Sequence, residues 1–155
     1  VGTGAGFPGM VLKVLEPTIQ LTLLDSLGKR MNWLSELSAQ LGAAPVECIH
    51  GRAEEQALLE GYRDCYDLAV SRAVADLRIL AELCLPFGSS KSSLMPTAIS
   101  QIIVAIAKLG GQLRPMAQYQ IPGTEITRRV VVVEKIRPTP KGYPRRFSRM
   151  KKAPL

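Results

Sequence analysis

The sequence predicts an α/β fold with a doubly wound parallel sheet that carries helices on both faces. Segments typical of strands and of helices alternate along most of the chain, which favours parallel pairing with helical crossovers. The first complete strand, residues 19–24, is mostly apolar, as in a strand covered on both faces. The chain also opens on a glycine-rich stretch, VGTGAGFPG, that runs directly into an apolar, helix-compatible segment.

The expected elements follow from the spacing of apolar residues. Residues 8–15 are predicted to form a helix that ends at Glu16–Pro17, before the strand at 19–24. Ser26 can cap a helix over residues 27–41, whose leucines recur at helical spacing on one face. The next expected elements are strands at 46–49 and 66–70 and a helix at 74–85. The last are a helix at 97–109 and an antiparallel C-terminal hairpin of strands 112–121 and 126–133.

Two places depart from this alternation. Only Val1 remains of the strand that should precede the glycine loop. After Phe87 the stretch GSSKSS stands where another apolar strand is due, and it is predicted to be a serine-rich junction between helices. We therefore expect part of a central strand to be lacking, together with the segment before Val1.

The charge is concentrated at one end of the chain. The 155 residues carry 20 Lys and Arg against 13 Asp and Glu, a formal net charge of +7 at pH 7, and every acid precedes residue 137. Residues 1–136 are neutral overall, so the whole excess lies in residues 137–155. This predicts a folded domain over 1–136 and a basic, proline-punctuated, extended tail over 137–155 that suits a polyanion. A solubilising tail is the alternative.

The sequence gives little indication of a metal site, a redox site, an acid–base histidine or a membrane span. Cys48, Cys65 and Cys84 are spaced neither as a zinc site nor as a redox pair, and we expect reduced, buried thiols and no metal. The only histidine, His50, is predicted to be a turn residue rather than an acid–base group. The sequence contains no apolar run near the roughly 18 residues of a membrane span and no signal peptide, so we expect a cytoplasmic protein without a membrane partner.

The glycine loop is predicted to hold a nucleotide cofactor. Gly4, Gly6 and Gly9 fit the pattern GxGxxG, in which glycines allow a sharp turn and let a ligand approach the backbone. Asp25 ends the next strand, where a carboxylate can accept hydrogen bonds from both hydroxyls of a ribose. NAD, FAD and S-adenosylmethionine all fit this description, and the motif alone does not choose among them.

Further motifs narrow the choice. VGTGAGFPG, LLDSLGKR, GRAEE and YDLAVSRAVADL occur in this order, and LGGQL and VVVEKIRPTPKGYPRR follow downstream. In these segments the chain resembles the RsmG (GidB) family, over most of its length. The resemblance implies a Rossmann-like S-adenosylmethionine-dependent methyltransferase sheet without the family's N-terminal helical segment. It also implies methyl transfer to N7 of a guanine in small-subunit (16S) ribosomal RNA.

The resemblance also implies site residues. It places contacts with the methyl donor at Gly2 and Phe7, at Ala53–Glu54 after the third strand, and at Arg72, which would also be the catalytic residue. A guanidinium there can clamp the donor's carboxylate or an RNA phosphate, and a salt bridge to Asp67 or Asp76 is the alternative. The glycine pattern and the position of Asp25 complete the predicted cofactor site with Gly4, Gly6 and Asp25.

The expected partner is ribosomal RNA of the small subunit, bound by a monomer. The charge count places the predicted RNA contacts in the tail, at Arg137, Lys141, Tyr143, Arg145 and Arg146. Methylation of guanine N7 needs no general base, since N7 has a free lone pair, and this agrees with the scarcity of histidine. The alternatives are an RNA-binding module with an inactive methyltransferase fold and an NAD- or FAD-binding oxidoreductase.

Overall fold

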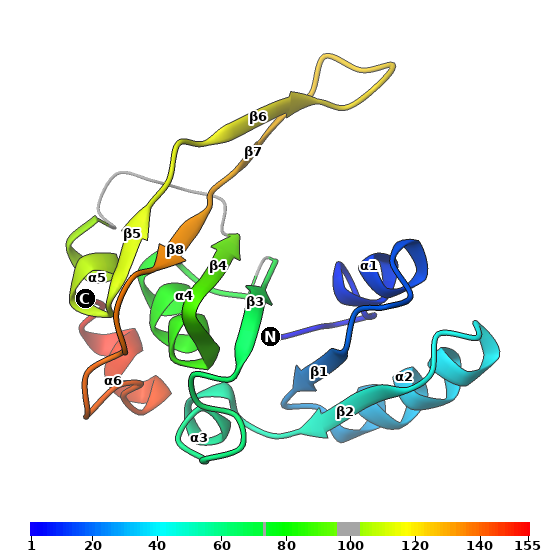
Figure 1. The fold of residues 1–155 in the computed structure, drawn as a ribbon, viewed down its shortest axis with the longest axis horizontal. Coiled ribbons are helices and arrows are strands. Elements are labelled where there is room, and N and C mark those ends of the chain that lie inside the picture. Colours follow the sequence, from blue (N-terminus) through cyan, green and yellow to red (C-terminus); the bar gives the residue numbers. More distant parts are fainter. Residues whose placement is uncertain (73, 96–102) are drawn as a thin grey trace.

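A computed structural model describes residues 1–72, 74–95 and 103–155 (Figure 1). The helices are α1 (Gly9–Leu15), α2 (Gly28–Gln40), α3 (Ala53–Gln56), α4 (Leu77–Cys84), the 3-10 helix η1 (Leu85–Phe87), α5 (Ile103–Lys108) and α6 (Phe147–Lys152). The strands are β1 (Leu21–Asp25), β2 (Val46–His50), β3 (Tyr66–Val70), β4 (Gly88–Met95), β5 (Gly111–Leu113), β6 (Ala117–Gln120), β7 (Thr127–Val130) and β8 (Val133–Lys135). Strands and helices alternate up to β4, as predicted.

The strands are arranged in two groups that the start of the chain connects. β1 and β2 pair in parallel, and a second sheet has the order β3–β4–β8–β5, with β3 and β4 parallel and β8 antiparallel to its neighbours. The amino nitrogen of Val1 donates to the carbonyl of Val70 at the end of β3 (2.9 Å), and the Gly2 amide donates to the carbonyl of Leu24 in β1 (2.8 Å). Residues 1–2 therefore bring the carboxyl ends of β1 and β3 together.

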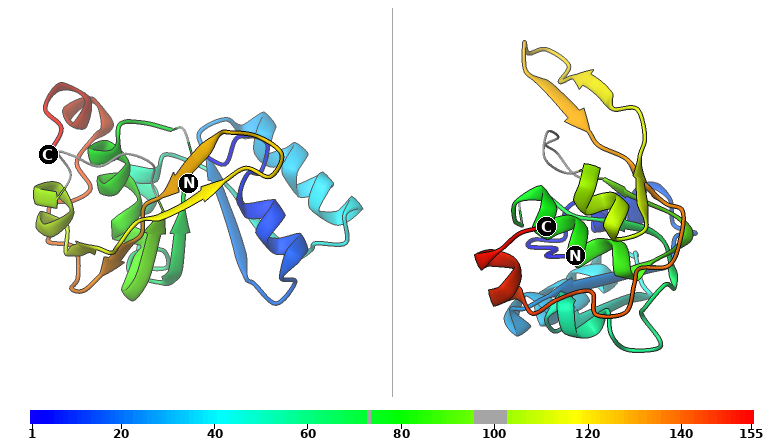
Figure 2. Two further views of the ribbon diagram at one scale, coloured as in Figure 1. Left: turned by 90° about the horizontal axis from the view of Figure 1, so that it is seen from above. Right: turned by 90° about the vertical axis from the view of Figure 1, so that its left-hand side faces the viewer.

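Apolar side chains fill a core on each side of this junction. On one side α1 and α2 pack on β1 through Met10, Met31 and Leu34. On the other side α4 is buried along most of its length, and it shares a core with α5, β8 and α6. Both groups of helices stand beside their strands in Figure 2. Among the residues that the structure describes, no helix is both long enough and apolar enough to cross a membrane.

The serine-rich stretch after Phe87 differs from the prediction. It forms strand β4, which pairs with β3 from Tyr66↔Gly88 to Val70↔Met95, with an irregularity in the register between the two ends. The prediction of a gap in the sheet at this place was therefore wrong. Pairing uses backbone groups, so a segment with few apolar residues can still occupy a strand position that β3 and β8 flank.

The C-terminal hairpin forms around Pro122–Gly123 as predicted, but each predicted strand is interrupted. β5 and β8 belong to the main sheet, whereas β6 and β7 form a separate antiparallel ribbon that projects from the body (Figure 1). The predicted helix at 97–109 is observed from Ile103 on, and residues 97–102 lie outside the described residues.

The tail is not the extended arm that was predicted. Phe147 and Met150 lie one helical turn apart, and the helix α6 that contains them buries Met150 completely against α4 and its neighbours. The side chain of Thr139 is also buried, where its hydroxyl donates to the carbonyl of Leu109 (2.9 Å). The net charge of residues 137–155 concealed these apolar contacts. The division of the chain at residue 136 stays a prediction, but the segment after it packs on the body.

Candidate functional site

A cavity of about 220 Å³ lies at the carboxyl ends of β1 and β2, beside residues 1–2. Four of the residues predicted to bind a cofactor line it, and they come from separate parts of the sequence: Gly2, Asp25, Ala53 and Glu54. Val74 and Phe147 complete its walls with side chains that the cofactor prediction did not include. This edge of a parallel sheet is where α/β folds place their ligands.

The glycine loop reaches the cavity through Val1 and Gly2, whereas Gly4 and Gly6 do not line it. Gly2 has a φ of +60°, and a Cβ atom there would lie 2.4 Å from Val74 Cγ2, so only glycine fits without a shift. Gly6 has a φ of +92° and lies close to Met10 and Leu34, which holds the loop against the start of α1. Gly4 belongs to the same turn. The loop thus presents backbone to the cavity at Gly2.

Asp25 connects the loop to the next helix. Its carboxylate is 5% exposed and accepts hydrogen bonds from the backbone amides of Gly4 (Oδ2, 3.0 Å) and Leu27 (Oδ1, 3.1 Å). Arg30 Nη1 lies 3.4 Å from Oδ2. Each carboxylate oxygen can accept more than one hydrogen bond, so capacity remains for a ligand hydroxyl. Asp25 therefore shapes the cavity, and the contact with a ribose stays a prediction.

The opposite wall contains Ala53–Glu54, at the start of α3. The carboxylate of Glu54 accepts hydrogen bonds from Nε and Nη2 of Arg52, at 3.2 and 3.1 Å. The Arg52 guanidinium also lies 4.9 Å from the centroid of the Phe147 ring, in a cation–π contact. This wall is thus linked to the first residue of α6, although the two are far apart in the sequence.

Arg72 and Phe7 lie together. Neither residue lines the cavity, although Arg72 is close in sequence to Val74, which does. The Arg72 guanidinium is 5.6 Å from the centroid of the Phe7 ring, and both residues are exposed. Asp76, one of the alternative partners for Arg72, caps α4 and pairs instead with Arg78 at 3.2 Å. An exposed guanidinium held on an aromatic ring is in a position to meet an incoming anion, but its catalytic role stays a prediction.

Arg145, predicted to contact RNA, has a different partner. Its Nε and Nη2 donate to Oε1 and Oε2 of Glu82, at 2.8 and 2.7 Å, and its backbone amide donates to Oε1 at 2.8 Å. Glu82 lies in α4 with its side chain buried. The neighbouring carboxylate raises the pKa of the Arg145 guanidinium above its usual value. Arg145 therefore anchors the tail to the body.

The other predicted RNA contacts are divided between packed and exposed positions. The Tyr143 ring has Lys108 Nζ at 5.8 Å and the Arg145 guanidinium at 5.9 Å from its centroid, which makes it a half-buried packing residue. Arg137 is exposed, and its Nη2 donates to the carbonyl of Ala107 (2.6 Å). Lys141 and Arg146 are exposed to solvent. The last two are thus placed as the RNA hypothesis requires.

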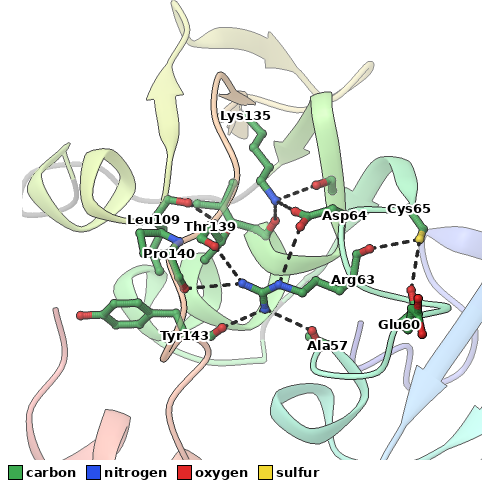
Figure 3. A network of polar contacts seen from close by, with 12 residues as sticks. Ala57, Glu60, Arg63, Asp64, Cys65, Leu109, Lys135, Thr139, Pro140 and Tyr143 are labelled. Carbon is green, nitrogen blue, oxygen red and sulfur yellow. Dashed lines mark hydrogen bonds and ion pairs between the residues drawn. The ribbon is translucent and has the colours of Figure 1, made fainter.

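A polar network that the sequence reading missed holds the tail in place (Figure 3). Arg63 donates to the carbonyls of Thr139 (2.8 Å) and Tyr143 (2.9 Å), so its guanidinium fixes the path of the tail. Lys135, in β8, is fully buried, pairs with Asp64 and donates to the carbonyls of Leu85 (3.0 Å) and Gly88 (2.8 Å). Burial lowers the pKa of Lys135 below the usual value of a lysine.

A signal for this network was present in the sequence. Lys135 lies two residues after the apolar run VVVV, just beyond the predicted strand at 126–133. A lysine so close to an apolar strand needs a partner once it is buried, and Asp64 is that partner. Which acid it would be, 71 residues away, could not be known from the sequence.

The fold and the cavity define a Rossmann-like class that includes methyltransferases. The structure is similar to a precorrin-6y C5,15-methyltransferase from Geobacter metallireducens, with a TM-score of 0.57 and 14% identity over 86% of this chain and 75% of that one. It is also similar to an rRNA methylase from Streptococcus thermophilus, with a TM-score of 0.54 and 16% identity over 87% of this chain and 83% of that one. At this level of identity the likeness shows the fold alone.

Sequence comparison then gives the family. The family model described as rRNA small subunit methyltransferase G (GidB) matches residues 1–97. A relative from Alkaliphilus metalliredigens, named ribosomal RNA small subunit methyltransferase G, is 44% identical over 162 aligned residues, which are all of this chain and 68% of the relative. The chain belongs to the GidB family of small-subunit rRNA methyltransferases, and the predicted family is thereby confirmed.

Proposed function

We propose that this chain is an S-adenosylmethionine-dependent methyltransferase that acts on N7 of a guanine in small-subunit ribosomal RNA. The observation that carries this proposal is the convergence of Gly2, Asp25 and Ala53–Glu54 on one cavity. Family membership supports the choice of a methyl donor over NAD or FAD. We also propose that the protein works in the cytoplasm as a monomer and binds ribosomal RNA rather than a membrane.

The residues of the cavity fit an adenosyl cofactor. Val74 fills the space in which a side chain at residue 2 would lie, so this position requires glycine, and Gly2 lines the cavity with backbone alone. Asp25 retains lone pairs for ribose hydroxyls, and the turn at Ala53–Glu54 can present backbone groups to an adenine edge. Phe7 offers an apolar surface beside Arg72. These assignments use Gly4 and Gly6 only as parts of the loop.

The chemistry asks little of the protein beyond orientation. S-adenosylmethionine, when bound, supplies a sulfonium methyl group to the lone pair of guanine N7. No proton has to be removed from N7, so the chain needs no general base in the site. Its residues serve to bind the two reactants in line and to exclude other geometries, which can account for a large part of a methyl transferase's rate. Arg72 is the proposed catalytic residue, as a clamp for an anionic group of one reactant.

Calorimetric titration with S-adenosylhomocysteine tests the cofactor assignment. Asp25→Ala should weaken binding by about 1.5–3 kcal/mol if Asp25 holds the ribose through charge-assisted hydrogen bonds. Because Asp25 also accepts from Gly4 and Leu27, thermal denaturation of the variant is needed to show that it is folded. Thr22→Val, on the same strand as Asp25, removes an exposed contact with Glu47 of β2 and is the matched control. Unchanged affinity in folded Asp25→Ala would exclude the ribose contact.

The same titration separates the alternative functions. A stronger response to NAD or FAD than to the methyl donor would favour an oxidoreductase. RNA binding without any response to the methyl donor would favour a binding module with an inactive fold. Incorporation of a labelled methyl group into small-subunit ribosomal RNA, followed by mapping of the modified atom, tests the guanine N7 assignment directly.

A further inference from the structure

α6 contributes an aromatic wall to the candidate cofactor cavity. Phe147, the first residue of this helix, lines the cavity together with Gly2, Asp25 and Glu54. The Arg52 guanidinium lies over its ring at 4.9 Å from the centroid and donates at the same time to Glu54. The aromatic wall is therefore connected through one guanidinium to the part of the site that is proposed to meet the adenine.

Two anchors fix the position of this wall. Met150 is completely buried against the core on one side of α6. On the approach to the helix, Arg145 pairs with the buried Glu82 and donates through Nη1 to the carbonyl of Ala153 (3.1 Å) just after the helix. With both ends of the segment held, the Phe147 ring has a defined place at the cavity.

The outward side of the same segment is basic. Its exposed charged residues are Arg146, Arg149, Lys151 and Lys152. Residues 137–155 contain no acid that would neutralise them, so this surface is suited to the phosphates of an RNA. A helix of six residues thus faces the cofactor cavity with Phe147 and solvent with its bases.

We propose that Phe147 is a contact residue for the adenosyl part of the cofactor. This inference rests on the proposed function. An aromatic ring offers a planar apolar surface on which a nucleoside can pack. Because Met150 and Arg145 already hold α6 in place, the ring is in position before a ligand binds, and cofactor and RNA are expected to bind this segment independently.

The test compares wild type with Phe147→Leu, which keeps an apolar side chain at this position but removes the aromatic face. Ser148→Ala, at the exposed next position of α6, is the matched control. S-adenosylhomocysteine affinity is measured by calorimetry, and affinity for a small-subunit ribosomal RNA fragment by fluorescence anisotropy, with and without saturating S-adenosylhomocysteine. Thermal denaturation shows that each variant is folded, and Phe147→Tyr shows whether an aromatic ring restores binding.

We expect Phe147→Leu to bind S-adenosylhomocysteine about tenfold more weakly, and Phe147→Tyr to recover most of this loss. Saturating S-adenosylhomocysteine should change the RNA affinity of wild type and Ser148→Ala by less than about twofold, because α6 is docked with or without the cofactor. Wild-type cofactor affinity in folded Phe147→Leu would overturn the contact. If wild type itself does not bind S-adenosylhomocysteine, the proposed function fails instead.

Discussion

Arg145 and Glu82 form a two-pronged ion pair between the tail and the middle of α4, with Nε–Oε1 and Nη2–Oε2 distances of 2.8 and 2.7 Å. The carboxylate side chain is 1% exposed and the guanidinium 18%. The backbone amide of residue 145 adds a third hydrogen bond to the same carboxylate. A carboxylate inside an apolar helix is thus satisfied almost entirely by one residue of a segment that carries the chain's excess positive charge.

Arg145→Ala should destabilise the protein by about 3–5 kcal/mol, because it leaves a buried carboxylate without its counter-charge. Arg146→Ala is the matched control: it removes a base of equal charge that is exposed, and its effect should stay within about 0.5 kcal/mol. Urea denaturation followed by circular dichroism measures both. A loss below about 1 kcal/mol for Arg145→Ala would mean that water enters and hydrates Glu82.

Glu82→Gln tests the same pair from the other side. The amide keeps the shape of the side chain but accepts through one oxygen only, so Arg145 loses part of its two-pronged contact. In the double variant Glu82→Gln/Arg145→Ala, no buried charge is left unpaired. We therefore expect the double variant to be more stable than the sum of the two single changes predicts, and urea denaturation of all four proteins gives this coupling energy.

Local patterns predicted most elements before β4, because those elements have regularly spaced apolar residues and end at turn residues, but the short helix α3 was not predicted. The strand β3 is found at Tyr66–Val70, as predicted. The observed ends of α1 and α2 lie within one residue of the predicted ends. β4 was missed because its place in the sheet comes from the backbones of β3 and β8 on either side, and not from its own serine-rich composition.

The candidate site was predictable where it depends on motifs and not where it depends on distant contacts. Asp25 ends β1 and Ala53–Glu54 follow β2, so they meet at one edge of the sheet, and Gly2 is held beside them by its hydrogen bond to Leu24. Phe147 belongs to the segment 137–155, which was predicted to be an extended arm because of its net positive charge and its prolines. Only the pairing of Arg145 with Glu82 and the burial of Met150 bring it to the cavity.

Replacement by alanine should have different effects at two glycines of the loop. Gly2→Ala puts a Cβ atom 2.4 Å from Val74 Cγ2 in a backbone with positive φ, so it should both destabilise the protein and weaken binding of S-adenosylhomocysteine. Gly4→Ala has similar backbone strain but nothing within 4 Å, and should cost only the roughly 1–2 kcal/mol of a left-handed residue. Calorimetry and thermal denaturation measure the two effects. Equal loss of cofactor affinity in both variants would show that strain, and not the space at Val74, is decisive.

The three cysteines should react with iodoacetamide in the order of their exposure. Cys65 is exposed, which corrects the expectation of three buried thiols, whereas Cys84 is completely buried. Burial raises the pKa of the Cys84 thiol to about 11, so at pH 8 it has almost no reactive thiolate. Mass spectrometry should find Cys65 alkylated first, and Cys84 only after denaturation. Early alkylation of Cys84 in the folded protein would contradict its burial.

The same thiol gives a pH dependence of stability with a definite sign. A thiol pKa raised from about 9 in the unfolded chain to about 11 in the fold means that the folded state holds the proton more tightly. Its contribution is therefore complete below pH 9 and is lost as the pH rises from 9 to 11. Cys84→Ala should remove this part of the alkaline decline, which urea denaturation at pH 8, 9 and 10 measures. A decline of the same size in Cys84→Ala would assign it to other groups.

Deletion of residues 137–155 should disrupt the cofactor site as well as the basic surface of the tail. The deletion removes Met150 from the core and Arg145 from Glu82, and takes away the Phe147 wall of the cavity. We expect the truncated chain to lose cooperative unfolding and cofactor binding together, as followed by thermal denaturation and calorimetry. A truncated chain that stays folded and keeps full cofactor affinity would show that the tail is an independent appendage, as its charge alone had indicated.

Substitutions that remove the positive charges of the tail, without unfolding it, test its role in RNA binding. Arg149→Gln/Lys151→Gln/Lys152→Gln changes only exposed positions of α6 and leaves Phe147 and Met150 in place. Each phosphate contact contributes roughly 0.7 to 0.9 to the slope of log affinity against log salt concentration, so the slope should fall by about 2 if all three bases contact RNA. Fluorescence anisotropy with an RNA fragment at several salt concentrations gives this slope. Lys29→Gln/Arg128→Gln, which neutralises exposed bases on α2 and β7, is the control and should change the slope less. If the control lowers the slope more than the α6 variant does, RNA is bound through α2 or β7 rather than through α6, and the charge of the tail serves another purpose.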